Sequence, residues 1–202
     1  RRLVAEATIY ALATYAEGLP IAVPLAMGGV TALITSRVWS IPGVVGEDRQ
    51  LTDTLYGYSD DTRQLVTLNT ATGAATPIGP MTYRPLGLAF DENSRSLFGS
   101  AFGDDEIILI DAGDASATSR GSTGGIFTQA LAYNSSTNEL FGFDDDSNRL
   151  VRFDPDTGAA TLFEPIGLDD VHALATDPVN DRLFGLDDDT GNLIRIDPVN
   201  GK

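Results

Sequence analysis

The stretch Leu183-Phe-Gly-Leu-Asp-Asp-Asp-Thr-Gly-Asn-Leu-Ile-Arg-Ile-Asp-Pro-Val-Asn-Gly201 contains two short apolar segments, and a polar turn follows each of them. Short segments with alternating apolar side chains predict β-strands, and clusters of Asp, Asn, Pro and Gly predict tight turns. The opening tripeptide recurs as Leu55-Tyr56-Gly57, Leu97-Phe98-Gly99 and Leu140-Phe141-Gly142, at intervals of 42, 43 and 43 residues. The chain is therefore built from a repeat.

Each copy of the repeat predicts four strands. The tripeptide lies on the second strand, and an Asp-rich turn separates it from a third strand such as Arg149–Asp154. A strand of small residues precedes the tripeptide, as in Ala130–Asn134, and an Ala-Thr strand ends the copy, as in Ala159–Glu164. This pattern predicts an all-β fold, a β-propeller of four-stranded antiparallel blades. We expect the aromatic residue of the tripeptide to pack between blades, and its Gly to permit close backbone approach.

The repeats divide the propeller, residues 46–202, into predicted blades at about residues 44–80, 86–122, 129–167 and 172–202. The innermost strand of the first blade is predicted near Val44-Val45-Gly46. No Ala-Thr strand follows the last third strand, so residues 193–196 present an open edge, which proteins normally cover. Either residues 29–35 complete this blade and close a four-bladed ring, or the chain is a fragment of a larger propeller. The sequence favours the fragment, because its repeats show no adaptation to the curvature of four blades.

Residues 1–45 differ from the repeats, because the acidic residues are concentrated after residue 45. Arg1-Arg2 precede an apolar stretch that ends in small residues, which predicts a leader derived from an export signal or a poorly specified segment. A packed helix is an alternative. A membrane span is disfavoured, because Pro20, Pro24 and Gly28-Gly29 interrupt a helix.

The composition excludes several kinds of site and partner. The chain has no Cys, so it offers neither a disulfide nor a thiolate metal site. Its net charge of -16 repels nucleic acid, DNA included, and anionic lipid, so we expect no membrane association apart from the leader. Cations, glycans and basic proteins remain as partners.

The Leu183–Gly201 stretch and its copies, over about residues 50–202, resemble the repeats of bacterial, mostly exported β-propellers of the broad NHL and YVTN type. The resemblance implies a propeller fold and an exported location, periplasmic or extracellular. It does not imply one activity, because these families include binding modules, lyases and lactonases. The copies lack the Trp-Asp ending of WD repeats, and the single Trp, Trp39, lies outside them.

The turns between the second and third strands are acidic. They contain Asp60-Asp61, Asp104-Asp105, Asp144-Asp145-Asp146 and Asp187-Asp188-Asp189. In a propeller these turns share one face, so we expect their carboxylates to form a ring around the mouth of the channel. Hard cations bind several oxygen ligands, so the ring is a candidate Ca²⁺ site, and Ca²⁺ is the one cofactor that the sequence suggests. An ordinary turn is the alternative, because Asp hydrogen-bonds its own backbone in turns.

Two further motifs carry weaker signals. Asp154-x-Asp156-x-Gly158 has the opening spacing of a calcium loop, but it lacks the downstream Glu and also fits a hairpin turn. His172 is the single His, and it lies beside Asp169 and Asp170 at the start of an inner strand. A His with carboxylate neighbours at a channel mouth is a candidate general base, and an ordinary loop residue is the alternative.

The function that the sequence favours is a non-enzymatic binding or scaffolding propeller. Its acidic loop face would meet a cation, a glycan or a protein. The alternative is an enzyme, a lyase or a lactonase-like hydrolase with its site at the channel mouth, for which His172 is the candidate residue.

Overall fold

The computed structural model describes residues 9–14, 20–25 and 30–36 as backbone, and residues 54–69, 72–165, 167, 171–177, 179–188 and 190–201 with their side chains. Every regular element in this part of the chain is a β-strand. Consistent with this, the described residues contain no helix of the length and apolarity that a membrane span needs.

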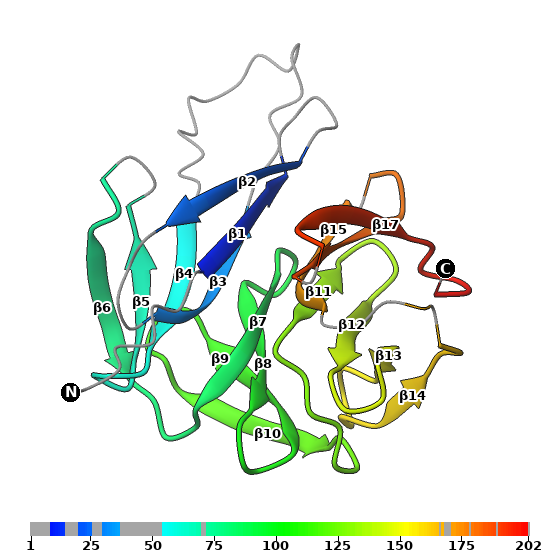
Figure 1. Cartoon of the computed structure of the whole chain (residues 1–202). Helices are drawn as coiled ribbons and strands as arrows, with labels where there is room; N and C mark the ends of the chain where they lie inside the picture. Colours follow the sequence, from blue (N-terminus) through cyan, green and yellow to red (C-terminus); the bar gives the residue numbers. More distant parts are fainter. Residues whose placement is uncertain are drawn as a thin grey trace, which may run out of the picture.

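Most strands form antiparallel sheets, the blades, which radiate from a centre (Figure 1). The strands of a blade are called A, B, C and D in chain order, and they run from the centre outward. Blade 1 contains β3 (Val30–Ser36), β4 (Thr54–Ser59), β5 (Gln64–Leu68) and β6 (Ala75–Pro80). Blade 2 contains β7 (Pro85–Asp91), β8 (Ser96–Ala101), β9 (Glu106–Asp111) and β10 (Ala117–Ser122). Blade 3 contains β11 (Leu131–Asn134), β12 (Glu139–Asp144), β13 (Arg149–Phe153) and β14 (Ala160–Leu162). Blade 4 contains three strands in the described residues, β15 (Val171–Asp177), β16 (Arg182–Asp187) and β17 (Asn192–Ile196). The predicted all-β architecture of four-stranded antiparallel blades is confirmed.

The Leu-aromatic-Gly tripeptide lies on strand B of every blade, as predicted. The aromatic ring of one blade packs against strand A of the next: Tyr56 stacks on Phe90 at 5.5 Å between centroids, and Phe98 lies 5.0 Å from Tyr133. The Gly has little free space, because a Cβ atom at Gly142 would lie 2.7 Å from Cε2 of Phe153. The tripeptide therefore has the packing role that the sequence predicts.

A two-stranded sheet stands between the first and last blades. It contains β1 (Ile9–Thr14) and β2 (Pro20–Leu25) in antiparallel register. Strand β1 contacts both β3 of blade 1 and β15 of blade 4, while β3, β7, β11 and β15 contact one another in sequence. Figure 1 shows this hairpin, in blue, above the centre of the molecule. The inner strands therefore form a continuous circuit that includes β1.

The structure corrects the prediction for the start of blade 1. The strand that pairs with β4 is β3 (Val30–Ser36), and the predicted strand near Val44–Gly46 lies outside the described residues. Strand β3, which precedes residue 45, thus belongs to the sheet of blade 1, and the division of the chain into a leader and a propeller at residue 45 stays a prediction. Residues 29–35 do not complete blade 4 either: in the described part of the chain, β16 is the one strand paired with β17. The Val, Ile and Thr residues of β3 suit a strand. The sequence analysis did not assign β3 to blade 1, because β3 and β4 are much farther apart in the chain than strands A and B of the other blades.

Neighbouring blades meet at the outer rim through backbone. A Cβ atom at Gly158, in the turn between strands C and D of blade 3, would lie 2.4 Å from the carbonyl oxygen of Gly121 in blade 2. A Cβ atom at Gly121 would in turn lie 2.1 Å from the carbonyl oxygen of Thr157. Gly79 of blade 1 approaches Asp114 of blade 2 in the same way, with 2.6 Å from a Cβ atom to the carbonyl oxygen. Each of these outer strands therefore rests on the C–D turn of the next blade.

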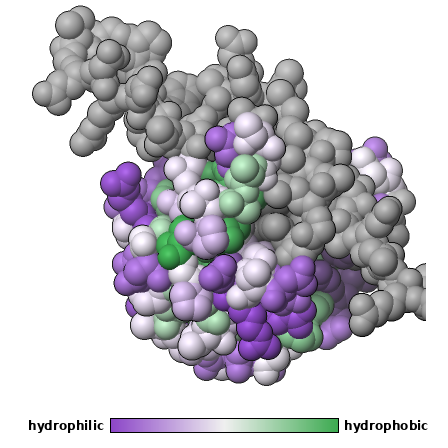
Figure 2. All heavy atoms as spheres, turned by 90° about the vertical axis from the view of Figure 1, so that its left-hand side faces the viewer, coloured by the Kyte–Doolittle hydropathy of each residue, from purple (hydrophilic) through white to green (hydrophobic). Residues whose placement is uncertain are grey.

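The outer strands themselves are polar. Strand β6 is largely exposed and contains Pro77 and Pro80, which cannot donate a backbone hydrogen bond at the edge of the sheet. Figure 2 views the side of the molecule that carries blade 1, and hydrophilic residues in purple surround a smaller apolar area in green. Edge strands of this composition resist pairing with another chain.

Candidate binding face

One end of the propeller, called here the loop face, carries two kinds of connection. These are the B–C turns, at residues 60–63, 102–105, 145–148 and 188–191, and the connections between blades, at residues 81–84 and 123–130. Backbone hydrogen bonds join the two kinds: the Phe102 amide donates to the carbonyl of Arg84 (2.8 Å), and the Asp145 amide donates to that of Phe127 (3.1 Å). The same bond in two blades holds the side chains of the loop face in equivalent places.

The B–C turns share one backbone geometry. Their fourth residue has a positive φ in every blade: 53° at Arg63, 53° at Asp105, 55° at Asn148 and 67° at Gly191. Asn, Asp and Gly accept this left-handed conformation with little strain, which explains the fourth residue of the turn in blades 2, 3 and 4.

Two of the predicted metal ligands close these turns. Asp144 and Asp187 are buried, with 4% and 7% of their surface exposed. The Asp144 carboxylate accepts a hydrogen bond from the Ser147 hydroxyl, and the Asp187 carboxylate accepts one from the Thr190 hydroxyl at 2.8 Å. These two residues therefore have the hydrogen bonds of an ordinary Asp turn, and their role as metal ligands stays a prediction.

The other acidic residues of the B–C turns are spread around the face. Asp104, Asp105, Asp146 and Asp188 are exposed, the Asp145 carboxylate accepts a hydrogen bond from Nε2 of Gln129 at 3.2 Å, and Asp189 lies outside the described residues. Among the side chains that the structure describes, no group of three or more His, Asp or Glu residues is placed to hold a metal ion. The Ca²⁺ site stays a prediction.

The Asp154-x-Asp156-x-Gly158 motif forms a hairpin turn at the opposite end of the blade. The Asp154 carboxylate accepts hydrogen bonds from the backbone amides of Asp156 and Thr157, both at 2.9 Å. These bonds lower the pKa of Asp154 below its ordinary value of 3.8, because they favour the ionised carboxylate. The structure therefore supports the turn alternative for this motif.

The lowered pKa of Asp154 predicts a pH dependence of stability. A carboxylate whose pKa is depressed in the folded state stabilises that state above the unfolded pKa, here about 3.8, and the contribution is lost as the pH falls further. Asp154→Asn keeps an oxygen acceptor but does not titrate, so its melting temperature should fall less than that of the wild type below pH 3.8. Thermal melts from pH 7 to pH 2 measure this, and parallel curves for the two proteins would contradict it.

His172 lies on the loop face, where its Nδ1 atom is 3.7 Å from Oδ2 of Asp188. Both side chains are exposed, so their interaction is screened by water and has little effect on stability. The neighbours expected from the sequence, Asp169 and Asp170, lie outside the described residues. Catalysis by His172 stays a prediction.

The structure also brings together Arg84, Phe102 and Phe127, which the sequence analysis did not select. Arg84 donates through Nε and Nη2 to the two carboxylate oxygens of Asp60, each at 2.6 Å. The guanidinium carbon of Arg84 lies 5.0 Å from the centroid of the Phe102 ring, and Phe127 meets that ring edge-on at 6.2 Å. Phe102 nevertheless keeps 46% of its surface exposed.

A comparison of the four sequence repeats gives one indication of the cluster of Arg84, Phe102 and Phe127. Phe102 occupies the position that Asp60, Asp145 and Asp188 occupy in the other blades. A turn needs no large apolar side chain at this position, because the other blades form the same turn with Asp. An exposed Phe at an acidic position is therefore a feature that the blade geometry does not explain.

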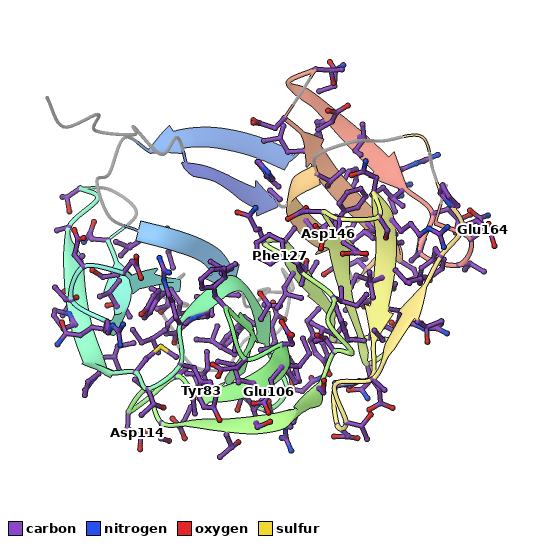
Figure 3. The ribbon with its side chains drawn as sticks, turned by 60° about the horizontal axis from the view of Figure 1, so that its bottom comes forward. Tyr83, Glu106, Asp114, Phe127, Asp146 and Glu164 are labelled. Atoms are coloured by element: carbon purple, nitrogen blue, oxygen red, sulfur yellow. The ribbon has the colours of Figure 1, made fainter. Side chains whose placement is uncertain are left out.

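A small hollow opens beside Phe102, between blades 2 and 3. Its volume is about 20 Å³, which holds about one water molecule. Leu86, Ile126 and Phe127 form its apolar wall together with Phe102, and Asp105 and Glu106 are also part of its lining. Figure 3 shows Phe127 and Asp146 near the centre of the molecule, whereas Asp114 and Glu164 lie at the periphery. The lining of the hollow thus includes two aromatic and two acidic residues.

Comparison with known proteins identifies the fold. No protein-family model and no curated protein matches the sequence. A chain of a nidogen/laminin complex superposes with a TM-score of 0.67 at 15% identity, over 96% of this chain and 72% of that chain. The fold is a β-propeller.

Two further solved propellers are similar. A protein of unknown function from Bacteroides thetaiotaomicron gives a TM-score of 0.60 at 15% identity, over 86% of this chain and 42% of that chain. Streptogramin B lyase gives 0.56 at 14% identity, over 92% of this chain and 57% of that chain. The chain thus spans about two fifths of the bacterial propeller and somewhat more than half of the lyase. That it is a fragment of a larger propeller is consistent with these lengths and stays a prediction.

Proposed function

We propose that this chain is a non-enzymatic, exported binding propeller of the NHL and YVTN type, and that its loop face holds a basic protein partner. The observation that carries the proposal is Phe102, an exposed aromatic residue set among carboxylates on the face where Asp60 already neutralises Arg84. Protein interfaces combine a few aromatic anchors with a polar or charged rim, and this face offers both.

Charge supports a basic partner. The chain has a net charge of -16, and its B–C turns contribute exposed carboxylates at Asp61, Asp104, Asp105, Asp146 and Asp188. Such a field attracts a cationic surface over about 8 Å at physiological salt and raises the association rate. An acidic glycan or a nucleic acid would be repelled by the same field.

The solved propellers include both a protein in a complex and an enzyme, so the fold alone does not choose between binding and catalysis. The hollow beside Phe102 favours binding. Its volume of about 20 Å³ is far below the roughly 300 Å³ or more of pockets that bury a small molecule. A site of this size suits the end of one side chain that belongs to a larger partner. An exported location rests on the resemblance of the repeats.

The proposal is tested with a hexalysine peptide as a cationic probe. The wild type should bind it, with an affinity that falls as salt rises from 50 to 300 mM, because screening weakens attraction between exposed charges. Asp104→Asn with Asp146→Asn should lower the affinity by about threefold or more. Fluorescence anisotropy of a labelled peptide measures both effects.

The control variant is Asp114→Asn with Asp156→Asn, which removes the same charge from C–D turns at the opposite end of the blades. It should bind hexalysine within about twofold of the wild type. Equal losses in the two double variants would show that net charge alone attracts the peptide. That result, or no binding by the wild type, would overturn the proposal.

A further inference from the structure

Phe102 and its surroundings specify the partner more closely than charge does. The Arg84 guanidinium group already lies against the Phe102 ring, 5.0 Å from its centroid. Attraction between a guanidinium cation and an aromatic ring is strongest when the cation is partly desolvated and oriented. Asp60 provides that orientation through its two hydrogen bonds to Arg84. The contact between Arg84 and Phe102 is therefore an internal example of the guanidinium–aromatic contact that the Phe102 ring can offer to a partner.

The hollow lies beside this internal example, and the Phe102 ring next to it keeps 46% of its surface exposed. Arg84 does not line the hollow, whereas Phe102, Phe127, Asp105 and Glu106 do. The positive charge of Arg84 is neutralised by Asp60, so it does not oppose an incoming cation. Among the described residues that line the hollow, none is basic, and two are acidic.

The lining matches a side chain with an apolar stem and a flat cationic end. Leu86, Ile126 and Phe127 provide apolar surface next to the Phe102 ring, and Asp105 and Glu106 place two acidic residues at the same hollow. An arginine guanidinium group is planar, weakly hydrated and donates two parallel hydrogen bonds to a carboxylate. A lysine ammonium group is strongly hydrated and compact, so it gains less from an aromatic surface.

We propose that the exposed Phe102 ring, beside the hollow, binds one arginine side chain of the basic partner, with the guanidinium group against the ring, its tip at the hollow and the acidic residues Asp105 and Glu106 next to it. This assignment rests on the proposed function, because it names the residue type that the loop face recognises. It adds selectivity for arginine over lysine, which the acidic field by itself does not give, because both side chains carry the same charge.

The test compares hexaarginine with hexalysine, two peptides of equal charge. Fluorescence anisotropy gives the dissociation constant of each peptide for the wild type, Phe102→Leu and Glu106→Gln. We expect the wild type to prefer hexaarginine by about fivefold, and Phe102→Leu to remove most of this preference while hexalysine affinity changes by less than about twofold. Glu106→Gln tests the acidic residue next to the ring and should weaken hexaarginine more than hexalysine.

A matched control is Leu162→Ala, which removes another exposed apolar side chain, on β14 at the outer rim. It should leave both affinities unchanged. Equal affinity of the wild type for the two peptides, or a preference that survives Phe102→Leu, would overturn the arginine site and leave the basic-partner proposal standing.

Failure of the wild type to bind either peptide would overturn both proposals. Binding of a neutral oligosaccharide, cellohexaose, that is lost in Phe102→Leu would assign the aromatic ring to a sugar and overturn the arginine site. The folded state of each variant is checked by its melting temperature, and an exposed position such as Phe102 should tolerate Leu.

Discussion

Replacing Gly158 with Ala is expected to destabilise the propeller by about 3 kcal/mol. Two effects combine at this position. An L-residue at the φ of +71° of Gly158 costs about 1 to 2 kcal/mol, because Cβ crowds the neighbouring carbonyl. The added Cβ would also lie 2.4 Å from the carbonyl oxygen of Gly121, so the backbone of blade 2 or blade 3 must shift, at a further cost of about 1 to 3 kcal/mol.

Gly191→Ala is the matched control. Its φ of +67° is nearly the same, but a Cβ atom there would meet no atom within 4 Å. We expect this variant to lose about 1 kcal/mol, which is the conformational part alone. Urea unfolding at 25 °C gives both values from the shift in midpoint. Equal losses in the two variants would show that the rim contact between blades 2 and 3 does not contribute to stability.

Phe141→Ala is expected to cost about 4 kcal/mol, because it removes a fully buried ring from the core. Phe141 belongs to a cluster that spans two blades and includes Phe143 of blade 3 and Leu174 and Leu183 of blade 4. The cavity left by the ring would lie where these blades meet, and a packed core relaxes only in part to fill it.

Phe184→Ala provides the comparison, because Phe184 has the same repeat position in blade 4 but is only half-buried. Its loss should be about half as large, since less apolar surface leaves the protein interior. Guanidinium unfolding curves compare the two. If Phe184→Ala lowered the free energy of unfolding as much as Phe141→Ala, the aromatic residue would stabilise the protein through contacts within its own blade rather than contacts between blades.

The blade fold could be predicted from the sequence because the spacing of the repeats, the pattern of their strands and the residues of their turns all indicate the same structure. The spacing of Leu-aromatic-Gly, the alternation in strands such as Arg149–Phe153 and the Asp and Gly turns all specify one four-stranded unit. Repetition then compensates for the weakness of any single short strand as a signal. The inner strand of blade 1 was missed for the complementary reason: β3 lies far from β4 in the sequence, and pairing between distant strands leaves no local pattern.

The candidate site was predicted less well. The acidic turns were found, but Asp144 and Asp187 have a structural role that composition does not distinguish from metal binding. The cluster of Arg84, Phe102 and Phe127 depends on contacts across a blade boundary. An alignment of the four copies reveals Phe102 as a departure from Asp, but it does not show which side chain from the neighbouring connection will meet it.

The common geometry of the B–C turns makes the recognition surface modular. Turns of equal length, each with a left-handed fourth residue, support Asp at one blade and Phe at another without a change in the frame. Selectivity can therefore change by exchange of single side chains between blades, while strand register and blade packing stay intact. A Phe at position 145 or 188 would present a second aromatic surface, and two such surfaces on one rigid frame would bind a partner with two arginines by avidity.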